Sequence, residues 1–232
     1  MRKIFLILIL FSITCLGQSK DPKMIIKNLK DAFNKVRDYT VNVDVKVDVN
    51  FIKVPEMNAK IYFKQPDKVH IESKGFAMLP KDGMYTSPLS FLKDEYTPLY
   101  VKDEVIDNHN TSVIKIIPLN DKGNLILTTL WVDQSKEVIR KVESTTKTNG
   151  TFSLYLHYEY NFKYPLPDSM VFSFNSGEIN SRFDPDEAGG AVRKRKIPKV
   201  IEGKVFIRYS SYAVNKGIPD SIFEKAKEKS KK

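Results

Sequence analysis

The sequence is poor in the residues on which catalysis and cross-linking depend. Its 232 residues include one cysteine, three histidines and one tryptophan. A single cysteine cannot form a disulfide within the chain, and His70, His109 and His157 are scattered without a partner set. The signatures of zinc proteases, serine hydrolases, phosphate-binding loops and dinucleotide-binding domains are missing. We therefore expect that the protein is not an enzyme and that it binds neither a metal nor any other cofactor.

The nearest approach to a metal site is the acidic group Asp184, Asp186 and Glu187. It resembles part of a calcium loop, but the remaining spaced oxygen ligands and the closing bidentate glutamate are missing. These residues fall in a polar stretch, 178–199, that we interpret as a long mobile loop. A solvated acidic loop is the simpler interpretation.

The first residues predict export from the cytoplasm. Arg2 and Lys3 precede an apolar run over 4–11, which is shorter than the roughly 20 residues that a membrane-spanning helix needs. This pattern is typical of a signal peptide, and small residues near Gly17 favour cleavage there. The alternative is a lipid anchor at Cys15, although the residues before it fit a lipoprotein cleavage site poorly. We expect residues 1–17 to be a signal peptide.

The remaining residues, 18–232, are expected to form one domain, because a chain of this length with 41% apolar residues can bury one core. The full chain carries a formal charge of +10, but 13 basic and only 4 acidic residues lie in 193–232. No nucleic-acid motif accompanies this basic tail, so we expect no nucleic-acid partner. The tail is either solvated or weakly attracted to anionic lipid headgroups at a membrane surface. We expect the protein to be a monomer.

The mature chain is predicted to begin with a helix followed by a long strand. Asp21 can cap the helix and Pro22 suits its first turn. Its apolar residues repeat at helical spacing: Met24, Ile25, Leu29, Phe33 and Val36. In the strand, valines alternate with polar residues, which predicts one apolar and one solvated face. These valines are Val41, Val43, Val45, Val47 and Val49.

A period of two recurs further along the chain. It predicts strands at 59–63 and 69–71, a hairpin of 125–132 with 138–144, and strands at 151–160, 169–174 and 204–212. The pattern lapses over 75–92, which is an apolar stretch broken by prolines and a glycine. This stretch can either fill part of the core or form a mobile lid. The whole indicates a mainly β fold of the α+β class, with a helix followed by an antiparallel meander.

The sequence is rich in large apolar and aromatic side chains, with 14 Phe, 11 Tyr and 6 Met. Strand 151–160 shows it best, with one continuous apolar face and Tyr155 on the other. Such strands can fill a sandwich core. They can also form a curved sheet around an apolar cavity, where each buried acyl methylene contributes about 0.8 kcal/mol. The residues alone leave both possibilities open.

Three segments, in this order and spacing, resemble the LolA-like outer-membrane lipoprotein carriers, in a divergent branch. They are 36–39 (VRDY), 61–69 (IYFKQPDKV) and 212–220 (YAVNKGIPD). The resemblance covers nearly the whole mature chain. It implies an N-terminal helix with an incomplete antiparallel β-barrel, closed by short helices, whose apolar cavity carries acyl chains of lipoproteins across the periplasm. It also implies partners among the lipoprotein-sorting proteins of the inner and outer membranes.

The same resemblance guides the choice of candidate residues. Alternation and the implied cavity give an inward-facing, lipid-binding set: Val43, Val45, Val47, Phe63, Ile71, Leu127, Leu154, Leu156, Phe172 and Phe174. The candidate lid comprises Phe76, Met78, Leu79, Met84 and Phe91. In carriers of this family an arginine before the proline of the Lys-x-Pro turn hydrogen-bonds to the lid. In this sequence Gln65 occupies the latch position. Because glutamine carries no charge, the lid gating of those carriers cannot simply be transferred to this protein.

Three functions remain open at this level. The first is a periplasmic carrier that binds acyl chains of lipoproteins or other lipids and moves them towards the outer membrane. The second is a sensor of the same fold that binds lipid or lipoprotein and signals through a protein partner. The third is an envelope hydrolase, which only a saturable rate lost on point mutation would support.

Overall fold

The structure is a computed structural model that describes residues 20–49, 52–73, 89–120, 123–147, 150–159, 162–176 and 201–224. Several predicted features lie outside these residues: the signal peptide 1–17 with Cys15, the loop 178–199, and the lid residues Phe76, Met78, Leu79 and Met84. Within the described part of the chain, no helix has the length and apolar character needed to span a membrane.

The predicted N-terminal helix is α1 (Pro22–Asn34). Asp21 caps it by accepting a hydrogen bond from the Lys23 backbone N–H at 2.9 Å, and Pro22 occupies the first turn. One face of the helix is buried through Ile25, Ile26, Leu29, Ala32 and Phe33. A helix of 13 residues is marginally stable on its own, so the packing of this apolar face against the sheet stabilises α1.

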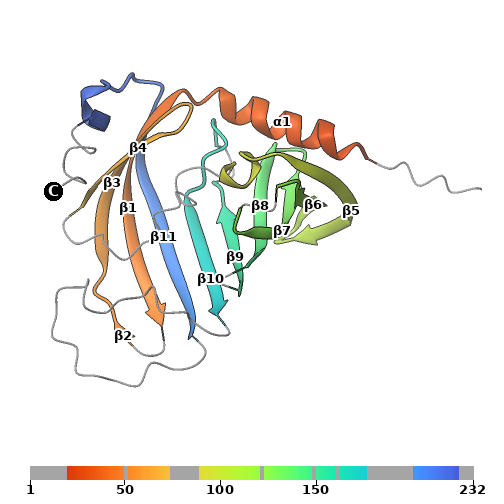
Figure 1. Ribbon diagram of the computed structural model, residues 1–232. Coiled ribbons are helices and arrows are strands. Elements are labelled where there is room, and N and C mark those ends of the chain that lie inside the picture. Colours follow the sequence, from red (N-terminus) through yellow and green to blue (C-terminus); the bar gives the residue numbers. More distant parts are fainter. Residues whose placement is uncertain are drawn as a thin grey trace, which may run out of the picture.

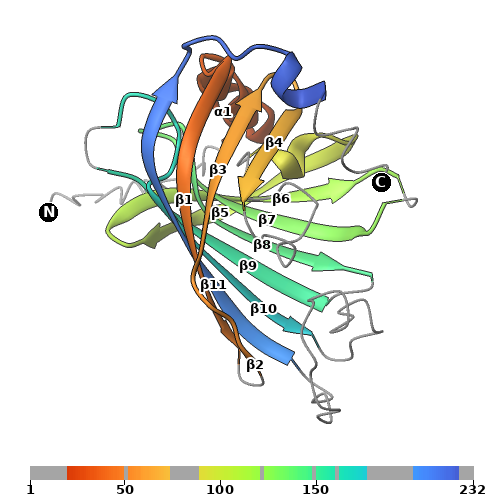
Figure 2. The same ribbon diagram turned by 90° about the vertical axis from the view of Figure 1, so that its left-hand side faces the viewer.

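In the part of the chain that the structure describes, eleven strands form one antiparallel sheet, and a 3-10 helix, η1 (Ser90–Leu92), precedes the fifth. The strands are β1 (Asp38–Val49), β2 (Ile52–Lys53), β3 (Met57–Lys64), β4 (Lys68–Ser73), β5 (Tyr96–Ile106), β6 (His109–Pro118), β7 (Leu125–Asp133), β8 (Val138–Thr146), β9 (Gly150–His157), β10 (Ser169–Ser176) and β11 (Ile201–Val214). The sheet is curved and unclosed, with β4 and β5 at its two edges (Figures 1 and 2). The predicted fold, a helix with an incomplete antiparallel β-barrel, is confirmed.

The strand order is β4-β3-β1-β11-β10-β9-β8-β7-β6-β5, with β2 paired to β1. The single meander predicted from the sequence is therefore only partly right. Two meanders, β1-β3-β4 and β5 to β11, are joined by pairing of the first strand with the last. Local periodicity cannot predict this junction, since it brings Tyr39 beside Val214 from the other end of the chain.

The sheet has an inner face, which we define as the face that carries α1 and η1. Register places apolar residues of neighbouring strands side by side on this face. One row crosses seven strands and consists of Ile114, Leu130, Val142, Leu154, Phe172, Val205 and Val47. The inner face thus carries an apolar row that is continuous over seven neighbouring strands.

Candidate functional site

The inner face contains most of the predicted lipid-binding residues. Val43, Val45, Phe63, Leu154 and Leu156 are buried members of the core that also includes the apolar face of α1. Val47, Ile71, Phe172 and Phe174 pack against this core but remain partly exposed. The second group is the part of the inner face where apolar side chains are still accessible.

Leu127 is the exception, because it lies on the outer face of the sheet. The register shifts between Leu125 and Leu127, where Ile126 is an extra residue opposite β8. Such a bulge reverses the alternation, so Leu125 pairs with the buried Thr146 whereas Leu127 pairs with Thr145. The inward residue of β7 is Leu130, which is fully buried. The assignment of Leu127 to the inner face therefore has to be corrected.

Aromatic rings line the inner face in an unbroken chain. The ring centroids of Phe91 and Phe152 lie 6.2 Å apart, those of Phe152 and Phe172 5.5 Å, and those of Phe172 and Phe174 5.5 Å. Phe91, the one candidate lid residue within the described chain, belongs to η1 and is buried. It is thus part of the packed inner face rather than separate from it.

Gly203 provides the space for the last ring of this chain. It pairs with Val49 on one side and Phe174 on the other. A Cβ atom at this glycine would lie 2.5 Å from Val49 Cγ1 and 2.7 Å from Phe174 Cζ. Glycine therefore allows both side chains to cover β11 at the end of the sheet.

Gln65 binds the C-terminal end of α1. Its side-chain Nε2 donates to the Val36 carbonyl oxygen at 2.7 Å and lies 3.5 Å from the carbonyl oxygens of Phe33 and Asn34. Its backbone N–H donates to the Arg37 carbonyl at 2.9 Å. These bonds satisfy acceptors that a helix end leaves free. The latch position of the sequence resemblance is thus a helix cap in this fold.

Asn215 completes the same corner from the other end of the chain. Its Nδ2 donates to the Lys35 carbonyl at 2.8 Å, and its Oδ1 accepts from the Arg37 backbone N–H at 2.7 Å. Asn215 has a φ of 57°, a left-handed conformation that Asn tolerates better than most residues. It therefore joins the end of β11 to the chain that leads from α1 into β1.

Asp38 and Lys64 add two further connections. The buried Asp38 carboxylate accepts from the backbone N–H groups of Lys216 and Gly217, both at 3.0 Å. Lys64 Nζ donates to the Ile218 carbonyl at 3.0 Å and to Asp220 at 2.8 Å. The three segments that carry the family resemblance, distant in sequence, thus meet at one corner. At this corner they hold α1, the first strand β1 and the last strand β11 together.

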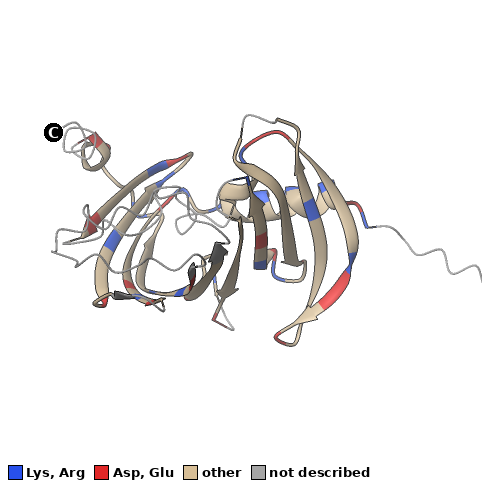
Figure 3. Cartoon of the chain, turned by 60° about the horizontal axis from the view of Figure 1, so that its bottom comes forward, with Lys and Arg blue, Asp and Glu red and all other residues tan. Residues whose placement is uncertain are grey.

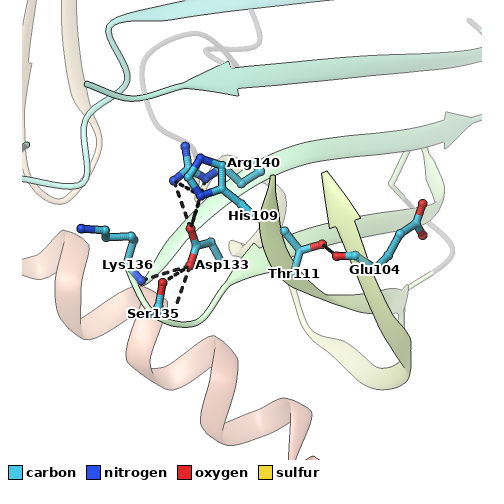
Figure 4. A network of polar contacts seen from close by, with 7 residues as sticks. All are labelled: Glu104, His109, Thr111, Asp133, Ser135, Lys136 and Arg140. Atoms are coloured by element: carbon cyan, nitrogen blue, oxygen red, sulfur yellow. Dashed lines mark hydrogen bonds and ion pairs between the residues drawn. The ribbon is translucent and has the colours of Figure 1, made fainter. Parts of the chain in front are cut away.

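A polar network outside the inner face was not predicted from the sequence. The buried Asp133 Oδ2 accepts from Arg140 Nη2 at 3.0 Å and lies 3.5 Å from His109 Nδ1. Its Oδ1 accepts from the Ser135 hydroxyl at 2.6 Å and the Lys136 backbone N–H at 3.2 Å (Figure 4). The network fixes the turn between β7 and β8.

The charge state of Asp133 follows from these contacts. Burial by itself raises the pKa of the carboxyl, but hydrogen bonds from Ser135 and Arg140, with the charge of Arg140, outweigh it. The pKa of Asp133 therefore lies below its usual value. The described residues hold no group of three His, Cys, Asp or Glu side chains placed to bind a metal ion.

Charges on the described chain are mixed. Basic positions along α1 and the strands are interspersed with acidic ones (Figure 3). The described part of the basic tail, 201–224, carries three basic and three acidic residues. Asp220 in this segment forms ion pairs with Lys64 and Lys68, at 2.8 and 3.1 Å. The excess positive charge of the tail lies in 193–200 and 225–232, outside the described residues.

These features define a class of fold: an open antiparallel half-barrel with its N-terminal helix on an apolar inner face. Solved structures of LolA-like proteins share this fold. A LolA superfamily protein from Nitrosomonas europaea has a TM-score of 0.52 and 12% identity, with 88% of this chain and 98% of that chain covered. A domain named for outer-membrane lipoprotein sorting, from Vibrio parahaemolyticus, has a TM-score of 0.57 and 13% identity, with 87% and 95% covered.

A DUF1329 family protein from Desulfovibrio piger is similar to the same extent, with a TM-score of 0.58, 12% identity, and 88% and 98% of the two chains covered. At such identities the similarity concerns the fold. It confirms the LolA-like architecture that the three sequence segments predict. No model of a known protein family matches the chain, and no curated protein matches its sequence.

Proposed function

We propose that this protein is a periplasmic carrier that binds the acyl chains of lipoproteins or other lipids on its inner face and moves them towards the outer membrane. The proposal includes export by the N-terminal segment and involves no catalytic step. The partners that would load and unload the cargo are lipoprotein-sorting proteins of the two membranes. The LolA-like fold is compatible with this role without specifying it.

The observation that supports the proposal most strongly is the apolar row across the inner face. Its members are almost fully buried at one end, where Ile114 and Leu130 are both 0% exposed. At the other end, Phe172 and Val47 remain partly exposed although Val205 between them is buried. Accessible apolar side chains on the face that also holds the core are suited to an acyl chain, because burying each methylene contributes about 0.8 kcal/mol.

A pair of charge substitutions at one place in the sheet can test the proposal. Val47 lies on the inner face of β1 and pairs with Val205 of β11, and Phe206 is the next residue of β11 on the outer face. Phe206 is 39% exposed, so both positions can accept an aspartate without burying it completely. The readout is displacement of a fluorescent apolar probe by a lipid with a C16 chain.

We expect Val47→Asp to lower the affinity for the lipid at least about tenfold, because an acyl chain would have to desolvate the new charge. Phe206→Asp should bind like the unmodified protein. Circular dichroism and a urea titration establish that both variants are folded. Equal binding by the two folded variants would contradict an inner-face lipid site.

A further inference from the structure

Ser90 is unusual among the polar residues of the described chain. Its hydroxyl oxygen is buried, with less than 1 Å² exposed, and it has no hydrogen-bond partner. No other buried side-chain nitrogen or oxygen in the described ranges lacks one. Buried polar groups are nearly always hydrogen-bonded, so an exception calls for an explanation such as a missing ligand.

The position of Ser90 connects this hydroxyl with the inner face. Ser90 is the first residue of η1, and the next two residues, Phe91 and Leu92, are buried in the core. The Phe91 ring contacts the Phe152 ring of β9, which continues to Phe172 and Phe174. The unsatisfied hydroxyl therefore belongs to a segment that packs directly against the chain of rings proposed to contact lipid.

Other hydroxyls on the inner face have partners. Next to Phe152 in the register is Ser144, whose hydroxyl is 2.8 Å from that of Thr128. The Thr146 hydroxyl donates to the Gly150 carbonyl at 3.0 Å. Protein groups thus satisfy these polar atoms of the strands, whereas the hydroxyl at the start of η1 has no partner and becomes accessible only when a ligand displaces the side chains that cover it.

We infer that Ser90 donates a hydrogen bond to the carbonyl oxygen of an acyl ligand, an ester or an amide, whose chain lies along the inner face. This inference rests on the proposed function. A neutral acceptor suits the site, because Phe91 and Phe152 would make the desolvation of a charged headgroup costly. Ser90 would then select lipids with a carbonyl at the start of the chain over plain hydrocarbons and fix the position of the chain.

The test compares three ligands with equal chains: hexadecane, methyl palmitate and N-methylpalmitamide. Each competes with a fluorescent apolar probe for the exported chain, for Ser90→Ala and for Ser90→Thr. The matched control is Ser153→Ala, because Ser153 lies on β9 with its side chain on the face opposite to Phe152 and Leu154. Comparison of the ester with the amide distinguishes the two sources of the carbonyl.

The unmodified protein should prefer at least one carbonyl ligand to hexadecane by about five- to tenfold, the usual effect of one hydrogen bond. Ser90→Ala should lose this preference while its affinity for hexadecane is unchanged, and Ser90→Thr and Ser153→Ala should keep it. Ser90→Ala should also be at least as stable to urea, since it removes a buried hydroxyl without a partner.

The outcomes separate this inference from the proposed function. If the unmodified protein binds hexadecane but Ser90→Ala has the same ligand preference, Ser90 is not the carbonyl donor and only the inference fails. A clear loss of stability in Ser90→Ala would assign the hydroxyl a structural role and would also refute it. If none of the three ligands displaces the probe from the unmodified protein, both proposals fail.

Discussion

The cap formed by Gln65 leads to a prediction in which three substitutions at one position change the free energy of unfolding by different amounts, with a defined order. In Gln65→Ala, the Val36 carbonyl loses the donor that now lies 2.7 Å away. Because Val36 is 0% exposed, water cannot readily replace the bond. We expect a loss of about 1–2 kcal/mol in the free energy of unfolding.

Charge at the same position acts on the negative end of the helix dipole. Gln65→Arg keeps a donor and adds a positive charge near the last carbonyls of α1, so its stability should equal or exceed that of the unmodified protein by up to about 1 kcal/mol. Gln65→Glu has no donor and adds a negative charge, so it should be less stable than Gln65→Ala by a few tenths to about 1 kcal/mol.

The assay is urea unfolding followed by fluorescence and circular dichroism. Trp131, the single tryptophan, is 8% exposed and reports on the sheet. The order Arg, Gln, Ala, Glu from most to least stable is the expected result. If Glu were as stable as Gln, or Arg less stable than Ala, the contact between Gln65 and the helix end could not be the cause.

Three further predictions concern other parts of the fold. The pKa of Asp133 is lowered in the folded state, so its contribution to stability is present above the unfolded value of about 3.9 and is lost as the pH falls through the lower folded value; urea titrations should show an advantage over Asp133→Asn that is constant down to about pH 5 and shrinks at lower pH. Gly203→Ala should cost about 1–2 kcal/mol, because its Cβ would lie 2.5 Å from Val49 Cγ1 and 2.7 Å from Phe174 Cζ, and a higher urea midpoint would rule out this close approach. Asn215→Ala should be less stable than Asn215→Gly by up to about 1 kcal/mol, since both lose the side-chain bonds but glycine tolerates the φ of 57°, and equal stability would contradict this strain.

The elements with strong local signals could be predicted from the sequence. The cap at Asp21 and the helical spacing gave α1, and alternating valines gave β1. Both signals work because one face of each element is buried and the other is solvated. The hairpin of β7 and β8 was found in the same way, apart from the bulge at Ile126 that places Leu127 on the outer face.

Strands β5 and β6 were missed, for two physical reasons. β5 contains Pro98 and is an edge strand, where a proline is tolerated. In β6, four consecutive residues from Thr111 to Ile114 are buried, so the period-two pattern disappears. The signal that could have revealed them is the pair Asp107 and Asn108, whose φ values of 48° and 62° form a two-residue hairpin turn.

The candidate site depends on long-range contacts that periodicity does not contain. Alternation gives the two faces of a strand but not which of them points inward. The pairing of β1 with β11 and the position of α1 decide that question for Val47 and Phe172. Likewise, the unsatisfied hydroxyl of Ser90 can be recognised only when its surroundings are known.

The most direct test of the proposed carrier function is native mass spectrometry of residues 18–232, the predicted mature chain, purified from the periplasm of a Gram-negative host, followed by lipid extraction. The account predicts bound species that contain acyl chains and that a fluorescent apolar probe displaces. A clean mass of the protein alone, with no binding of the probe, would mean that the inner face is a closed core, and the carrier function would be refuted.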